Sequence, residues 1–144
     1  MIILFDTNVI LDLLLDRRPF SRDAALLVDQ VARQQLQGLL GATTITTIHY
    51  LARRSVGEAA AQRHVESLLS IFDVAPVGRG VLLDALRLGF ADDEDAVLHE
   101  AARQAGATGI VSRDLDGFKG AGLMLYRPAE LLRTLKAGPG RQKG

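Results

Sequence analysis

Acidic side chains occur at three separated places in this chain where carboxylates could take part in chemistry. Asp6 follows the apolar run at residues 2–5, residues 92–95 are four consecutive acids, and Asp114 follows the run at residues 108–112. One acid at a helix N-terminus is explained by capping or by the helix dipole, which favours it by a few tenths to about 1 kcal/mol. Four acids in a row exceed what capping needs.

Carboxylates that converge on one point need a compensating positive charge. Two of them about 4 Å apart repel by roughly 4 kcal/mol at an effective dielectric near 20. The 144 residues include no cysteine and three histidines, so a metal site must rely on carboxylate oxygens. Such ligands suit Mg²⁺ or Mn²⁺, which can polarise a phosphodiester and activate water. The acids therefore indicate the chemistry of a metal-dependent nuclease.

The elements that must position these acids alternate between strands and helices. Apolar, β-branched runs at residues 2–5 and 108–112 predict buried strands, and weaker runs predict three more, at residues 39–42, 72–75 and 124–126. Stretches between them have helical periodicity, most clearly at residues 58–71. This alternation predicts an α/β fold, a parallel sheet flanked by helices on both faces.

The carboxyl edge of such a sheet is where open α/β folds place their ligands. We expect Asp6 and Asp114 at this edge, together with the threonine-rich segment at residues 43–47. Asp92 and Asp95 are three residues apart and share one face of a predicted helix start, so this helix can join the same edge.

The helix after the first strand has two candidate N-caps, Thr7 and Asn8. The alternative to a chemical role for Asp6 is that Asp6 itself caps this helix. This helix is Leu-rich, and 48% of the chain is hydrophobic. Both features favour a homodimer face or a groove for the amphipathic helix of a partner.

Composition limits the remaining possibilities. Lys plus Arg and Asp plus Glu number 17 each, so no overall positive field attracts nucleic acid. The length predicts one domain, residues 1–136, followed by a disordered tail at residues 137–144. No apolar run reaches the roughly 18 residues of a membrane span and no signal peptide is evident, which predicts a cytoplasmic protein without membrane contact. The sequence has no Gly-rich phosphate loop and no G-x-S-x-G motif.

The ordered set of acidic motifs resembles the PIN domain family over nearly the whole chain. The resemblance lies in Asp6-Thr7-Asn8 after the first strand, the acids at residues 92–95 and the segment at residues 110–114. It implies a Rossmann-like parallel sheet flanked by helices, that is, a PIN-like α/β/α sandwich, and a ribonuclease that depends on Mg²⁺ or Mn²⁺. It also implies membership of a toxin–antitoxin pair, with RNA as substrate and an antitoxin protein as partner, as for the VapC toxins.

The resemblance also assigns the candidate site. Asp6, Asp95 and Asp114 match the core acids of the family as catalytic residues and metal ligands, and Asp92 is a further ligand candidate. The residues that could orient water or phosphate, or supplement these acids, are Thr7, Asn8, Thr46, His49, Ser112, Arg113 and Asp116.

One departure from the family pattern supports an alternative function. PIN ribonucleases usually carry a Glu in the helix after the second strand, and the matching segment at residues 43–50 has none; His49 falls near that place. The site then carries one negative charge fewer. The alternative is a catalytically degenerate PIN-like module that binds RNA or a protein partner without cutting.

Overall fold

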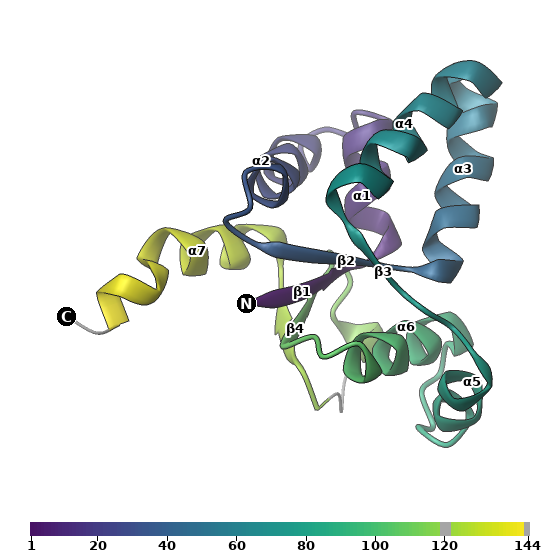
Figure 1. The fold of residues 1–144 in the computed structure, drawn as a ribbon, viewed down its shortest axis with the longest axis vertical. Helices are drawn as coiled ribbons and strands as arrows, with labels where there is room; N and C mark the ends of the chain where they lie inside the picture. Colours follow the sequence, from purple (N-terminus) through teal and green to yellow (C-terminus); the bar gives the residue numbers. More distant parts are fainter. Residues whose placement is uncertain (119–121, 143–144) are drawn as a thin grey trace.

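A computed structural model describes residues 1–118 and 122–142, and within them the chain forms one parallel sheet with helices on both faces (Figure 1). The strand order is β3-β2-β1-β4-β5, and each neighbouring pair is parallel. The strands are β1 (Ile2–Phe5), β2 (Gln37–Gly41), β3 (Asp73–Ala75), β4 (Gly109–Val111) and β5 (Met124–Tyr126). The predicted α/β class and sheet are confirmed.

Strand β1 lies at the centre of the sheet because both of its faces are apolar. Ile3, Leu4 and Phe5 are fully buried. Alternate side chains of a strand point to opposite faces, so Ile3 and Phe5 enter one core and Leu4 enters the other. The backbone N–H of Asp6 donates to the Val111 carbonyl at 2.9 Å, so Asp6 stands where the ladder with β4 ends.

The helices divide between these two cores (Figure 1). The first core lies under α1 (Thr7–Leu14), α2 (Ser21–Ala32), α3 (Ala42–Val56), α4 (Glu58–Ile71) and α7 (Pro128–Gln142). The second is smaller and rich in alanine, and it lies under α5 (Arg79–Leu86), α6 (Asp93–Gln104) and the short 3₁₀ helix η1 (Asp116–Phe118). Each of α1 and α3 begins directly after a strand, so their N-termini lie at the carboxyl edge.

One local prediction was wrong. The N-cap of α1 is Asp6, whose side chain accepts from the Thr7 N–H, and not Thr7 or Asn8. Gly38 lies inside β2, where a Cβ would stand 2.6 Å from the Phe72 ring. Strand β2 therefore needs glycine there because an aromatic ring packs against its backbone.

The C-terminal helix α7 begins at Pro128 and runs to Gln142. Gly138 interrupts it with φ 67° and ψ 156°, just past the predicted domain end at residue 136. The division into residues 1–136 and a disordered tail at 137–144 stays a prediction, and residues 143–144 lie outside the described part of the chain. Among the described residues, no helix is long and apolar enough to cross a membrane.

Candidate active site

Asp6 is the most constrained acid of the carboxyl edge. Its side chain is 7% exposed. One oxygen, Oδ1, accepts from the Thr7 N–H at 2.8 Å, and Oδ2 accepts from the Ser112 hydroxyl at 2.7 Å and the Asn8 amide at 3.4 Å. Burial raises the pKa of Asp6, the bonds from Ser112 and Thr7 oppose this rise, and the charge of Asp114 adds to it. Helix capping explains the hydrogen bond from Thr7 but not the one from Ser112, which follows β4.

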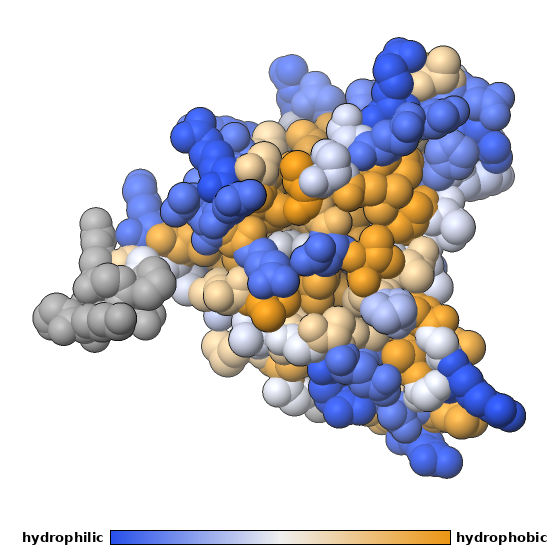
Figure 2. Space-filling view, viewed as in Figure 1, coloured by the Kyte–Doolittle hydropathy of each residue, from blue (hydrophilic) through white to orange (hydrophobic). Residues whose placement is uncertain are grey.

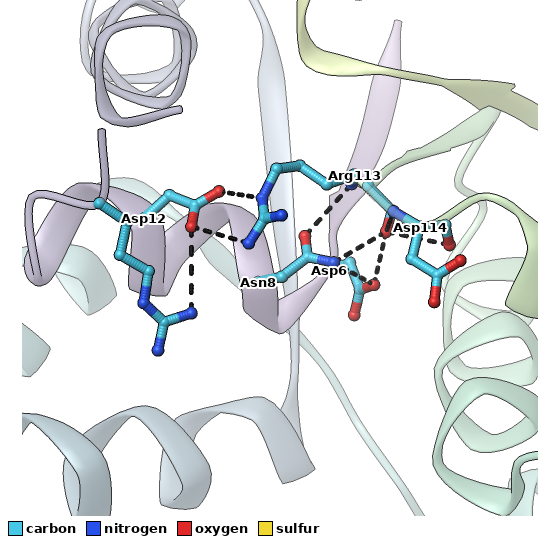
Figure 3. A network of polar contacts seen from close by, with 7 residues as sticks. Asp6, Asn8, Asp12, Arg113 and Asp114 are labelled. Atoms are coloured by element: carbon cyan, nitrogen blue, oxygen red, sulfur yellow. Dashed lines mark hydrogen bonds and ion pairs between the residues drawn. The ribbon is translucent and has the colours of Figure 1, made fainter. Parts of the chain in front are cut away.

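Hydrogen bonds of Ser112 and Asn8 join the residues that follow β1 to the residues that follow β4 (Figure 3). The buried Ser112 hydroxyl oxygen accepts from the Asn8 amide at 3.2 Å and from the Asp114 N–H at 3.0 Å. The same hydroxyl donates a hydrogen bond to Asp6. The side-chain oxygen of Asn8, Oδ1, accepts from the backbone N–H of Arg113 at 3.3 Å. These bonds fix the loop that carries Asp114 relative to Asp6.

Helix α6 brings Asp95 to this cluster. Asp92 is its N-cap and accepts from the Asp95 N–H at 3.0 Å. Partial burial, followed by the charges of Asp6, Asp92, Asp114 and Glu94, raises the pKa of Asp95 to about 6. Asp95 therefore lies within electrostatic reach of both strand-end acids.

Asp114 is exposed, and its charge raises the pKa of both Asp6 and Asp95. Glu94 has the same effect on both groups, although the sequence analysis did not select it. The feature of the sequence that could have indicated Glu94 is its place in the acidic run, one residue before Asp95. Asp116, the exposed first residue of η1, follows Asp114 in the same loop.

Gly117 in η1 provides the space that the Asp95 carboxylate occupies. A Cβ on Gly117 would lie 2.2 Å from Asp95 Oδ2, so Gly117→Ala must displace that carboxylate. We expect the variant to fold and the pKa of Asp95 to fall from about 6 toward 3.8 as the group moves to water. NMR titration of the carboxyl carbons measures this shift. Gly122→Ala, where a Cβ meets nothing within 4 Å, is the matched control, and an unchanged Asp95 pKa in Gly117→Ala would contradict the assignment.

Helix α3 contributes a hydroxyl and no acid. Thr44 is buried, and its Oγ1 lies 2.9 Å from Thr7 Oγ1, which joins the N-termini of α3 and α1. The Thr46 hydroxyl, selected from the sequence, donates to the Thr43 carbonyl at 3.0 Å within its own helix. His49 is half-buried, and its side chain makes no hydrogen bond or ion pair with the described residues. Thr44 belongs to the segment 43–47 expected at this edge but was not singled out, because the sequence does not show which of these five positions faces α1.

Arg113 directs its charge away from the acids (Figure 3). Its guanidinium donates two hydrogen bonds to Asp12, which is 1% exposed on α1, and lies 4.0 Å above the Phe20 ring. Arg17 is a second cation near Asp12, at 4.0 Å. Arg113 therefore does not neutralise the neighbouring Asp114, and the negative charge of the cluster stays uncompensated from this side.

The donor set fits Mg²⁺ or Mn²⁺ by its chemistry. It consists of hard oxygen ligands. Burial is the largest cause of the raised pKa of Asp6 and of Asp95, and the charges of neighbouring acids, which a divalent cation would offset, add to it. Within residues 1–118 and 122–142, however, no three His, Asp or Glu side chains are arranged to hold an ion as they stand. Asp6 is fixed by bonds to both of its oxygens, so binding requires the Asp95 and Asp114 side chains to turn toward it.

Comparison with known proteins finds solved structures with a similar fold. The structure is similar to FitAcB from Neisseria gonorrhoeae, with TM-score 0.69 and 20% identity over 88% of this chain and 98% of that one. It is also similar to VapBC-1 from nontypeable Haemophilus influenzae, with TM-score 0.68 and 18% identity over 90% and 99% of the two chains.

A third similar structure is VapC20 from Mycobacterium tuberculosis, described as a toxin that cleaves the sarcin-ricin loop, with TM-score 0.63 and 17% identity over 80% and 92% of the chains. A search of curated proteins gives no significant match. The sequence matches the family model for the PIN domain over residues 2–116. This match covers most of the chain and includes Asp6, Asp95 and Asp114, and the protein belongs to the PIN domain family.

Proposed function

We propose that the protein is a Mg²⁺- or Mn²⁺-dependent endoribonuclease that acts as the toxin of a toxin–antitoxin pair. The observation that carries the proposal is the group of mutually repelling carboxylates of Asp6, Asp95 and Asp114 at the carboxyl edge of the sheet. Asp92 and Glu94 add negative charge beside this group. Repulsion of this kind is tolerated in a site where a cation binds.

Each part of the cluster has a role in this proposal. Asp6, Asp95 and Asp114 would hold the ion, which when bound supplies Lewis-acid activation of water and of the scissile phosphate. Ser112 and Asn8 hold Asp6 in place, and the N-termini of α1 and α3 present positive dipole ends to the RNA phosphate.

The direct test is cleavage of single-stranded RNA by the purified protein. Cutting should require Mg²⁺ or Mn²⁺, stop with EDTA and leave no 2′,3′-cyclic phosphate, because water is the nucleophile. A substrate with 2′-deoxy sugars at the cut site should therefore still be cleaved. Cleavage that persists in EDTA would refute the assignment.

The second candidate is a PIN module that binds RNA or a protein partner without cutting. It is favoured by the absence of an acid in α3 and by the separation of the carboxylates, no three of which hold an ion as they stand in the described residues. RNA binding that is equal in Mn²⁺ and in EDTA, without products on a broad panel of RNAs, would establish it.

The pH dependence of stability should change sign when the ion binds. The folded-state pKa of Asp95, about 6, lies above its ordinary 3.8, so the unfolded chain releases this proton first. The apo protein should therefore lose stability as pH rises from about 4 to about 6. Binding of Mn²⁺ needs the ionised carboxylates, so stabilisation by Mn²⁺ should grow over the same interval. Urea unfolding at several pH values, with EDTA and with Mn²⁺, measures both trends, and parallel curves would contradict them.

An apolar groove fits the proposed antitoxin partner. A pocket of about 330 Å³ is lined by side chains from α1, α2 and α4, among them Leu13, Leu14, Val28, Leu68 and Ile71. Figure 2 shows apolar surface in this area, between α2 and α4. An amphipathic helix of an antitoxin would bury its apolar face there. Co-purification with the protein encoded beside this one, lost in Leu14→Lys, tests the assignment, and light scattering tests the predicted homodimer.

A further inference from the structure

A second pocket opens beside the acidic cluster. It has a volume of about 520 Å³, within the range of small-ligand sites, and its lining includes Phe20, Asp23, Arg113 and Arg127. Arg113 follows β4, and Arg127 follows β5. Because these strands are parallel, both arginines lie at the carboxyl edge that carries Asp114. The pocket therefore adjoins the proposed cleavage site on the β5 side of the sheet.

One part of this pocket is a flat, fixed platform. Phe20 is 44% exposed, and the Arg113 guanidinium lies over its ring, 4.0 Å from the ring centroid. The two hydrogen bonds to buried Asp12 hold the plane of the guanidinium. Aromatic rings and guanidinium planes are the surfaces on which unpaired nucleobases stack.

Arg127 supplies the charge that a phosphate needs. Its side chain is exposed, and it forms no ion pair with any residue in the described ranges, whereas Arg113 is already paired. Asp23 on α2 also lines the pocket and disfavours an anion near that helix. A phosphate is therefore expected near Arg127 at the start of α7, and a base near Phe20.

We propose that this pocket binds one nucleotide of single-stranded RNA next to the cleavage site, with its base on the Phe20–Arg113 platform and its phosphate on Arg127. The inference rests on the proposed function, because it assumes that RNA lies across the carboxyl edge of the sheet. It adds a preference for unpaired RNA that the acids alone do not give.

The test is binding of a fluorescein-labelled eight-nucleotide oligouridine, followed by anisotropy in EDTA so that no RNA is cut. Phe20→Ala should weaken binding by roughly 5- to 100-fold, the range for loss of one stacked base. Phe20→Leu keeps apolar volume without the ring and should weaken it similarly. Arg127→Gln should weaken binding and reduce the slope of log affinity against log salt by about 0.7.

Matched controls come from α2 and α7, the helices that directly follow Phe20 and Arg127. Leu26→Ala on α2 removes a side chain that is 45% exposed, and Arg133→Gln on α7 removes an exposed charge, both outside this pocket. Neither should change the affinity more than about 2-fold. Duplex RNA of the same length should bind more weakly than oligouridine and be insensitive to Phe20→Ala.

The outcomes separate this inference from the proposed function. If Phe20→Ala and Arg127→Gln bind oligouridine as the parent protein does, or if the parent does not bind it at all, the nucleotide pocket is refuted, whatever the cleavage assay shows. If both variants lose binding while the parent never cleaves RNA with Mn²⁺, the pocket stands and the nuclease assignment falls. Equal Phe20 dependence for duplex RNA would refute the stacking role.

Discussion

Asp6→Asn should abolish metal-dependent cleavage while the protein stays folded. The change removes one anionic ligand, so cleavage should fall by orders of magnitude, and Mn²⁺ affinity by at least roughly 10- to 100-fold, the loss seen for weaker changes around metal sites. Stability without metal should hold or rise, because burial and the charge of Asp114 already disfavour the ionised form of Asp6. RNA cleavage, Mn²⁺ titration and thermal unfolding in EDTA measure the three effects.

The hydrogen bonds around Asp6 explain why the fold should tolerate this change. Asn can still accept from the Thr7 N–H, and the Ser112 hydroxyl can donate to the Asp114 carbonyl, 3.3 Å away, in place of the Asp6 oxygen. Asp93→Asn is the matched control, since this exposed acid of α6 is not among the charges that shift the pKa of Asp6 or Asp95. If Asp6→Asn unfolds the protein, or leaves Mn²⁺ affinity unchanged, Asp6 is a structural cap and not a ligand.

Asp12→Asn should destabilise the protein and also weaken metal binding. The carboxylate of Asp12 is 1% exposed and accepts two hydrogen bonds from Arg113. Loss of charge-assisted bonds of this kind costs about 2 kcal/mol of unfolding free energy, reduced here because the Arg113 side chain is 29% exposed. Once released, Arg113 can turn to the adjacent Asp114 and compete with the cation there, so Mn²⁺ affinity should fall.

A comparable ion pair elsewhere in the chain provides the control for Asp12→Asn. Asp29 and Arg33 pair at 2.9 Å on α2, with both side chains well exposed. Asp29→Asn should therefore change the unfolding free energy by about 0.5 kcal/mol or less and leave Mn²⁺ binding unchanged. Urea unfolding and Mn²⁺ titration of both variants separate the two cases, and equal effects would contradict the role given to Asp12.

The fold could be predicted because its signal is local. The four apolar residues of β1 and the alternation with Ala- and Leu-rich helices indicate a parallel sheet, and a parallel sheet places the carboxyl ends of all its strands at one edge. Asp6 and Asp114 therefore stand near each other, as the sequence predicted, although their catalytic roles stay predictions. The helix start at Asp95 joins them because α6 packs against β4 and η1.

The rest depends on contacts between distant residues, which composition and periodicity do not reveal. Asp12 occurs in a run of leucines, and nothing local indicates that it pairs with Arg113, 101 residues away. The sequence suggested that Arg113 orients phosphate, whereas the structure turns its guanidinium to Asp12 and Phe20. Gly117 likewise gives no sign in the sequence that it makes room for Asp95.

The acids of the cluster stand on elements that should differ in local stability. Asp6 follows the central strand β1, which pairs on both sides and is buried from Ile3 to Phe5, so its amide protons should exchange only on global unfolding. Asp95 lies in the first turn of α6, where Asp93 and Glu94 are exposed and the Asp92 cap is the restraint. We expect fraying of that single turn to release Asp95 while the sheet persists. The number of acids near one another should thus follow a local opening equilibrium at the start of α6, which warming would shift before the protein unfolds.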